Sequence, residues 1–252
     1  MIPARWLASA AAIAAVPALA AEVAGVTEFS QRVELSTPVS GTVQRVAVDV
    51  GQRVKRGEVL LELDGTVQQA RVQEAQARLR RLSAEAAEAI RELERQQELY
   101  NRTVISTSEL DQAKLHHERA TTQVAEAQAQ LKLAQRRLAD TRITAPFDAV
   151  VVARLIEPGQ TVVTDLQAPP LVVVARADEM VARVIVAEGA IGALRSGSGA
   201  RVSVGGQSYD GRIRRVGLEP IKDSAAIEYP VEVVFAVSKP MPAGLPARVE
   251  LP

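Results

Sequence analysis

A long stretch without helix-breaking residues dominates this chain. None of its 15 Gly or 13 Pro residues lies between Thr66 and Ala145. Glycine and proline are the residues that most often interrupt helices, so this interval is expected to be helical. Small and apolar residues recur in it every seven positions, which is the repeat of helices that wind around each other with a left-handed twist. The sequence therefore predicts a coiled coil.

The heptad repeat is interrupted once, near its middle, at residues 101–105. Before the interruption the two rows are Val72, Leu79, Ala86, Leu93, Tyr100 and Ala75, Leu82, Ala89; after it they are Leu110, His117, Val124, Leu131, Leu138 and Ala113, Ala120, Ala127, Ala134. Ser106 and Glu109 then have the spacing of a capping box, which starts a new helix. Two helices of about 35 residues, each roughly 50 Å long, predict an antiparallel hairpin over residues 66–142.

Short Val/Leu-rich runs with glycine turns flank the hairpin on both sides. They cover residues 37–65 and residues 143–175, and the segment Thr37 to Val43 is similar to Thr144 to Val151. This similarity is an internal repeat. Neither half has enough strands to bury both of its faces, so we expect the two halves to close into one sandwich at the base of the hairpin.

An alternating apolar pattern returns in residues 176–252 and predicts a second all-β module. Its expected strands are Val181–Val186, Ala200–Val204, Gly211–Val216, Tyr229–Val237 and Ala247–Leu251. A short helical segment, residues 188–194, interrupts them. The N-terminal segment, residues 21–36, contains a further candidate strand for the same module at residues 23–34.

Residues 1–20 have the pattern of a cleavable secretory signal. Arg5 precedes an apolar run, residues 6–16, and Ala18-Leu19-Ala20 is a small-residue cleavage pattern. The apolar run is shorter than the roughly 20 residues that a membrane-spanning helix needs, so an uncleaved anchor is the less favoured alternative. The chain has no Cys, which excludes disulfides and a lipid-modified N-terminal cysteine. We expect export to a periplasm-like compartment.

Composition removes several classes of function. The 30 basic and 30 acidic residues give a formal charge of zero, so there is no electrostatic basis for binding nucleic acid. The two histidines, His116 and His117, are adjacent, and their side chains point about 100° apart on a helix, so they do not share a metal ion. Met180 and Met241 are distant in sequence and do not indicate a soft-metal site. We expect no metal, no cofactor and no catalytic group.

The order of half-sandwich, hairpin, half-sandwich and β module resembles the periplasmic adaptor family, also called membrane fusion proteins. One part of the resemblance is a lipoyl-like domain that is split into two halves. The first half contains residues 38–41 and 48–57, and the second half contains residues 143–148 and 157–162. The other part of the resemblance lies at the turn of the hairpin, where Arg95, Leu99 and Ser106 match the family's tip motif, Arg-x3-Leu-x6-Ser. In similar adaptors this motif docks onto TolC-type outer-membrane channels.

The resemblance extends into the last module, with departures. Residues 184–188, 211–216 and 242–249 are similar to the family's β-barrel domain. Ala149 stands where a glycine is usual and Leu245 where a methionine is usual. The sequence ends directly after the barrel, whereas in many relatives the chain continues into a membrane-proximal domain. The resemblance therefore leaves open how this chain contacts an inner-membrane pump.

The resemblance implies an α+β multidomain, elongated fold: an antiparallel coiled-coil hairpin inserted in a lipoyl-like β-sandwich, followed by a partial β-barrel. It implies a non-enzymatic periplasmic adaptor of a tripartite efflux system, which bridges an inner-membrane transporter and a TolC-type channel as a trimeric or hexameric ring. A proton-driven transporter of the RND type is favoured. An ATP-driven exporter or a type I secretion system is the alternative.

Other functions fit the residues less well. A lipoyl or biotin carrier needs an exposed lysine between the sandwich halves, but no lysine adjoins Asp64-Gly65 or Arg142, where the hairpin begins and ends. A freestanding coiled-coil scaffold does not account for the β-rich flanks. Each residue of the tip motif also has a local interpretation. Arg95 fits a solvated helix surface, Leu99 fits local packing, and Ser106 fits a cap that has no other role.

Overall fold

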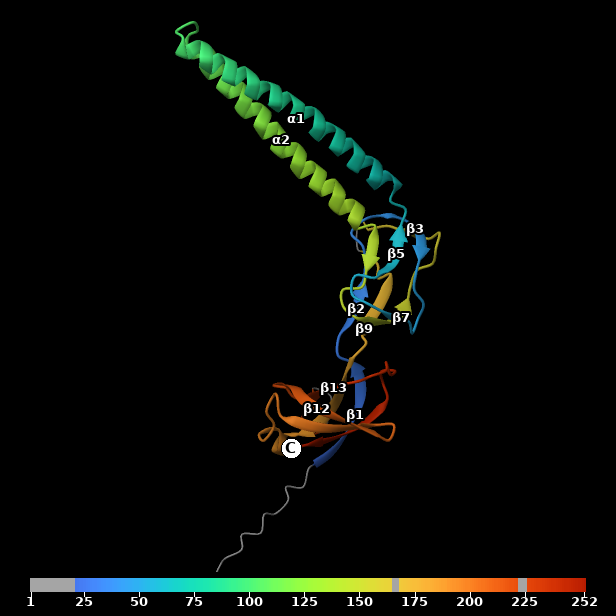
Figure 1. Ribbon diagram of the computed structural model, residues 1–252. Helices are drawn as coiled ribbons and strands as arrows, with labels where there is room; N and C mark the ends of the chain where they lie inside the picture. Colours follow the sequence, from blue (N-terminus) through green and yellow to red (C-terminus); the bar gives the residue numbers. More distant parts are fainter. Residues whose placement is uncertain (1–20, 165–167, 222–225) are drawn as a thin grey trace, which may run out of the picture. The chain divides into compact units, whose positions relative to one another are not determined.

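A computed structural model describes residues 21–164, 168–221 and 226–252 of the chain. The signal sequence predicted for residues 1–20 lies outside the described residues. The chain forms two compact units. One comprises residues 31–177, and the other comprises residues 21–30 together with residues 178–252 (Figure 1). Each unit has its own core.

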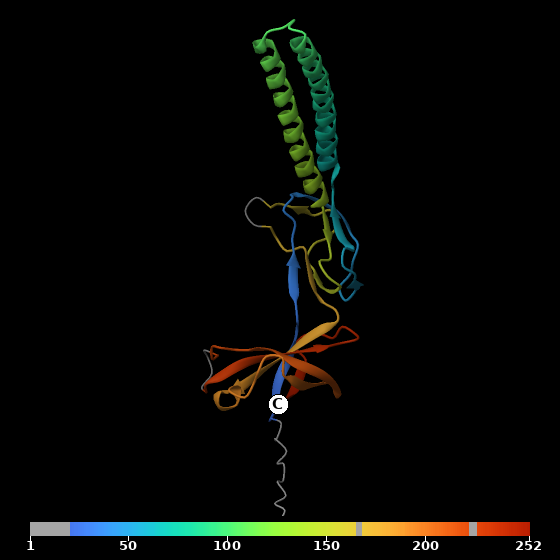
Figure 2. The same cartoon turned by 60° about the vertical axis from the view of Figure 1, so that its left-hand side comes forward.

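The predicted hairpin is present in the first unit. Helix α1 (Thr66–Asn101) and helix α2 (Thr107–Ala139) lie side by side, and the turn between them is remote from the sandwich (Figures 1 and 2). The buried apolar residues of the seam all belong to the predicted heptad rows: Val72, Leu82, Ala86, Ala89, Leu110, Ala120 and Ala127. Neither helix has the length and apolar character to cross a membrane, and the same holds for the remaining helix of the described chain.

One assignment in the heptad rows is wrong. Tyr100, at the end of its row, is 38% exposed, whereas the neighbouring Leu99 is half-buried. Before the turn, Leu93, Gln96 and Leu99 are half-buried, which makes two consecutive steps of three residues. A strict heptad alternates steps of three and four residues, so the regular repeat ends at Gln96 and the seam continues at Leu99 in place of Tyr100.

The sandwich consists of two four-stranded sheets in the described residues, with the orders β2-β9-β7-β4 and β6-β5-β3-β8. The strands are β2 (Arg32–Leu35), β3 (Gly41–Val46), β4 (Arg53–Val54), β5 (Val59–Leu63), β6 (Arg142–Thr144), β7 (Ala149–Arg154), β8 (Thr161–Val162) and β9 (Val172–Arg176). Each sheet combines strands from before and after the hairpin. The two halves therefore reunite around one core, which includes Leu60, Leu61, Val151 and Val172.

The internal repeat is visible in the hydrogen bonds between the halves. The N–H of Gly51 donates to the Val151 carbonyl at 2.8 Å, and the N–H of Gly159 donates to the Val43 carbonyl at 2.8 Å. Val43 and Val151 end the two similar sequence segments. In each half, the glycine turn is therefore hydrogen-bonded to the equivalent strand of the other half, so each half depends on the other.

The two turns also share their internal geometry. Gly51 has φ 85° and Gly159 has φ 88°, in the left-handed region that glycine adopts at little cost. The next residue, Gln52 or Gln160, accepts a hydrogen bond through its side-chain oxygen from the backbone N–H three residues earlier, at 3.0 and 2.9 Å respectively. The sequence pattern Gly-Gln therefore encodes the same turn twice.

The second unit is a β-barrel that its described strands close completely, in the order β1-β10-β13-β12-β11-β14. The strands are β1 (Ala21–Phe29), β10 (Glu179–Ala187), β11 (Gly199–Val204), β12 (Gln207–Val216), β13 (Glu228–Ala236) and β14 (Pro246–Leu251), with a short helix α3 (Glu188–Ile191) after β10. The barrel was expected to be partial. It closes because β1 pairs with both β10 and β14.

The single strand expected at residues 23–34 is divided in two. Its first part lies in β1 of the barrel, and its second part is β2, which pairs with β9 of the sandwich. A period of two indicates which side chains of a strand are buried, but it does not identify the partner strand. The division at residues 30–31 therefore had no signal in the alternation.

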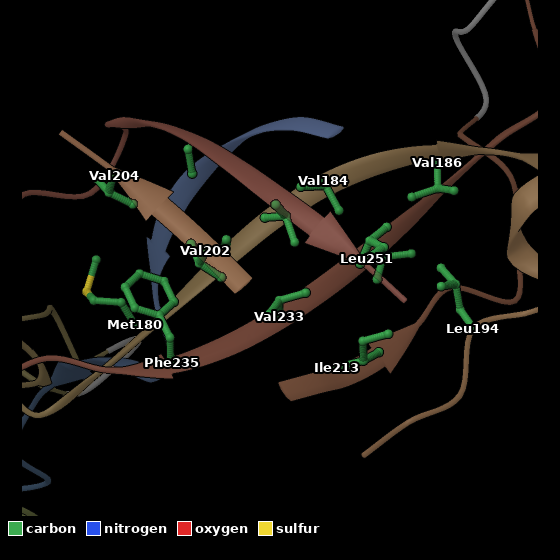
Figure 3. Packing of buried hydrophobic residues seen from close by; sticks show 14 of the residues in the cluster. Met180, Val184, Val186, Leu194, Val202, Val204, Ile213, Val233, Phe235 and Leu251 are labelled. Carbon is green, nitrogen blue, oxygen red and sulfur yellow. The ribbon is translucent and has the colours of Figure 1, made fainter. Parts of the chain in front are cut away.

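The core of the barrel is built mainly from valine. Met180 and Phe235 lie opposite each other on β10 and β13, and Figure 3 shows them together at one end of the core. Close packing also depends on Gly25 in β1, since a Cβ atom there would lie 2.2 Å from the carbonyl oxygen of Arg183. Small side chains and close backbone contacts thus replace the large residues that the composition lacks.

Candidate functional site

The three residues of the predicted tip motif lie at the turn end of the hairpin. Arg95 and Leu99 are in the last two turns of α1, and Ser106 is the N-cap of α2. Six residues separate Arg95 from the end of α1, which is about 9 Å along the helix axis. The motif therefore spans a short length of one helix and the beginning of the next.

The end of α1 is closed by a Schellman motif. The N–H of Thr103 donates to the Tyr100 carbonyl at 2.8 Å, and the N–H of Val104 donates to the Leu99 carbonyl at 3.0 Å. Thr103 has φ 62°, the left-handed conformation that this motif requires. The position usually carries glycine, and for an L-residue with a side chain the conformation costs roughly 1–2 kcal/mol.

Ser106 forms the capping box that the sequence predicted. Its side-chain oxygen accepts from the Glu109 N–H at 3.3 Å and donates its proton to a carboxylate oxygen of Glu109 at 2.8 Å. The Ser106 N–H donates to the same oxygen at 2.8 Å. Hydrogen bonds from this N–H, and then from the hydroxyl, hold the pKa of Glu109 below its usual value. The hydroxyl group keeps one lone pair for a partner.

Arg95 is held in place by its own helix. Its Nη1 donates to Glu92 at 2.6 Å, and its side chain remains 59% exposed. The other carboxylate oxygen of Glu92 accepts from Gln96 at 2.6 Å. Since a guanidinium has five N–H donors, most of the donors of Arg95 remain available to a partner. Leu99 is half-buried, so only part of its side chain is available.

The most exposed apolar side chain of the tip is one that the sequence analysis did not select. Val104 is 66% exposed; it is the last residue of the Schellman motif and lies two residues before Ser106. The exposed Arg102 precedes the turn. The available signal was the β-branched pair Val104-Ile105 just before the capping box, and this pair predicts a break in the heptad register and not the exposure of Val104.

The other sequence candidates form no site of their own. His117 is half-buried on the heptad row, with its Nε2 at 3.4 Å from the Thr121 hydroxyl oxygen, and His116 is exposed. In residues 21–164, 168–221 and 226–252 no group of three or more His, Cys, Asp or Glu side chains is arranged to hold a metal ion.

Comparison with known proteins agrees with this architecture. Residues 31–175 match the family model of the CzcB-like barrel-sandwich hybrid domain. The chain is 30% identical over 222 residues to the macrolide export protein MacA of Yersinia pestis, and the alignment covers 81% of this chain and 60% of that protein. It is 30% identical over 148 residues to the efflux pump periplasmic linker BepD of Brucella suis biovar 1, which covers 59% of this chain and 37% of that protein.

The fold also matches solved structures. The membrane fusion protein Spr0693 of Streptococcus pneumoniae R6 superposes with a TM-score of 0.70 over 92% of this chain and 98% of that one, at 14% identity. The chain spans about 60% of the length of MacA. Because the matched domain covers more than half of the sequence and contains the inserted hairpin, the chain belongs to the periplasmic adaptor family, also called membrane fusion proteins.

Proposed function

We propose that this chain is the periplasmic adaptor subunit of an efflux system and that it joins an inner-membrane transporter to a TolC-type outer-membrane channel. Arg95, Leu99 and Ser106 at the hairpin tip dock onto the channel. The single observation that carries the proposal is a capped helical hairpin that projects from a reunited sandwich and presents these three residues at its end. The role is structural and not enzymatic.

The chemistry of the tip supports recognition of a protein surface. Arg95 offers a planar set of donors suited to carboxylate or carbonyl oxygens. Ser106 holds the start of α2 in place, and Leu99 contributes partial apolar contact. The names of the relatives, an export protein and an efflux pump linker, support the same class of function.

The docking proposal is tested by binding of the purified TolC-type channel of the source cell to the full mature chain. Arg95→Asp is expected to weaken binding by about tenfold or more, the loss typical of a central arginine in an interface. The matched control is Arg81→Asp, because Arg81 is 62% exposed, forms an ion pair with Glu85 within the same helix, and lies more than three turns from Arg95. Equal binding of both variants and the wild type contradicts docking through Arg95.

Leu99→Ser needs a separate control, because Leu99 is half-buried and the substitution also affects the hairpin. The helix content and melting temperature of the variant are measured beside its binding. A loss of binding with a retained hairpin supports docking through Leu99, whereas a loss of both reports only on folding.

For the transporter we propose a proton-driven pump of the RND type, with an ATP-driven exporter or type I secretion system as the second class. Export in cells that carry the adaptor distinguishes them. A protonophore stops the first class directly, while depletion of ATP at constant proton gradient stops only the second. A trimeric or hexameric ring is part of the proposal, and native mass spectrometry of the chain with its transporter tests the subunit number.

We further propose that the chain acts in the periplasm after removal of residues 1–20. The intact mass of protein recovered from the periplasmic fraction tests this step. Recovery of a chain that still carries Arg5 and Trp6 contradicts cleavage.

A further inference from the structure

We infer that Val104 is the main apolar contact of the hairpin tip with the outer-membrane channel and that Thr103 positions it. This inference rests on the proposed function and deepens it, because it names a contact residue outside the Arg95, Leu99 and Ser106 motif. The partner surface that fits is a shallow apolar depression on the channel, rimmed by carboxylate or carbonyl oxygens.

Val104 presents apolar surface to the solvent at the tip. Val104 is 66% exposed, although it lies in a turn of five residues between two long helices. Leu99 is half-buried and presents less apolar surface. Apolar surface that is removed from water on binding contributes to affinity roughly in proportion to its area. In this tip the side chain best placed to do so is Val104.

Hydrogen bonds order the backbone on both sides of Val104. The Val104 N–H is hydrogen-bonded to the Leu99 carbonyl at 3.0 Å, so the residue is attached to the end of α1. Two residues later the capping box attaches Ser106 to Glu109 at the start of α2. The backbone of Val104 is therefore held from both sides, and a contact that is already ordered loses little conformational entropy on binding.

Thr103 has a backbone conformation that is rare for its residue type. A β-branched residue at φ 62° is unfavourable, and such strain persists only where the surroundings maintain it. Here the hydrogen bonds of the Schellman motif maintain it. The left-handed residue ends α1 and allows the Val104 N–H to reach the Leu99 carbonyl, in the conformation in which Val104 is exposed, so Thr103 acts as a positioning residue.

The charges around Val104 indicate the rim of the partner surface. Arg102 is exposed two residues before Val104, and Arg95 is 59% exposed on the last turns of α1. Both guanidinium groups donate to oxygen atoms in planar geometry. An apolar depression with acidic side chains or the carbonyls of helix ends around it is complementary to this arrangement.

The test uses the full mature chain and the purified TolC-type channel of the source cell. Val104→Ser is expected to weaken binding by about tenfold, the effect of burying one Val side chain, with unchanged helix content. Its matched control is Val67→Ser, because Val67 is 59% exposed at the opposite end of the same hairpin. Thr103→Gly permits the same φ and is expected to bind within about twofold of wild type, whereas Thr103→Pro, with φ fixed near −65°, is expected to lose binding.

The outcomes separate this inference from the proposed function. If Arg95→Asp weakens binding and Val104→Ser does not, Val104 is not the main apolar contact, and the docking function stands. If Val67→Ser weakens binding as much as Val104→Ser, the inference is also overturned. If the wild-type chain does not bind the channel, and a photocrosslinker at position 95 or 104 gives no adduct with it, both proposals are wrong.

Discussion

Replacing Gly25 with alanine is expected to open the barrel at its closing strand. The new methyl carbon would lie 2.2 Å from the carbonyl oxygen of Arg183 and 2.7 Å from Cγ1 of Val184. Carbon–oxygen contacts normally begin at about 3.3 Å, so β1 has to move away from β10. Overpacking costs about 1–3 kcal/mol, and because the blocking atom is backbone we expect the upper end, about 3 kcal/mol.

Two other glycines of the same barrel provide a graded comparison. A Cβ atom at Gly211 would meet Cγ1 of Val233 at 2.9 Å and the backbone oxygen of Val234 at 3.0 Å. These contacts are less close than the 2.2 Å contact at Gly25, so Gly211→Ala is expected to cost about 1–2 kcal/mol. A Cβ atom at Gly199 would meet nothing within 4 Å, so Gly199→Ala is expected to stay within about 0.5 kcal/mol of wild type.

Hydrogen exchange in increasing urea measures these differences separately for the barrel. The amide protons of β1 and β10 are followed, because the two units need not unfold together. In a thermal scan, 3 kcal/mol corresponds to roughly 12–24 °C for a unit of this size. The reasoning is refuted if Gly25→Ala exchanges like wild type, or if Gly199→Ala is as damaging as Gly25→Ala.

Three further predictions concern turns and caps. Gly51→Ala and Gly159→Ala are each expected to destabilise the sandwich by about 1–2 kcal/mol and by equal amounts in urea unfolding, since both turns have the same conformation; clearly unequal losses contradict the equivalence of the two halves. Thr103→Gly is expected to raise the stability of the hairpin by up to about 1 kcal/mol, the left-handed penalty less the entropy of glycine, and a lower melting temperature contradicts this. The pKa of Glu109 is lowered in the folded chain. The capping box therefore stabilises α2 fully above the unfolded pKa of about 4.3 and loses its effect as pH falls through the lower folded value. The measurement is amide exchange at the start of α2, which is expected to become faster in acid in the wild type and not in Glu109→Gln.

The sequence was most informative where local rules decide the structure. The interval without glycine and proline predicted both helices, and the start of α2 at Ser106 followed from a capping pattern within four residues. The heptad rows predicted every buried apolar residue of the seam. They misplaced Tyr100, because the buried face steps by three residues from Gln96 to Leu99 where the heptad repeat steps by four.

The sequence was least informative where the structure depends on distant partners. Closure of the barrel requires β1 to pair with β10 and β14, whose residues lie more than 150 positions away in the chain. Alternation shows the buried face of a strand and not its neighbour, so the separation of β1 from β2 was not predictable. At the tip, the spacing of Arg95, Leu99 and Ser106 was visible, but the exposure of Val104 depends on the left-handed Thr103, which nothing in the sequence signals.

The hairpin depends on both of its ends, because its seam does not determine its register. The central contacts are among Ala86, Ala89 and Ala120, with Val124 beside them, and such small side chains bury little area and resist sliding weakly. At the base, β5 pairs with β6, and the Glu62 carboxylate binds Arg45 at 3.2 Å and Arg142 at 3.3 Å. At the other end, the caps of the turn join α1 to α2 within five residues. The strand pair and the turn therefore determine the register of the two helices between them, and the position of the tip residues follows from strands that are almost eighty residues apart in the chain.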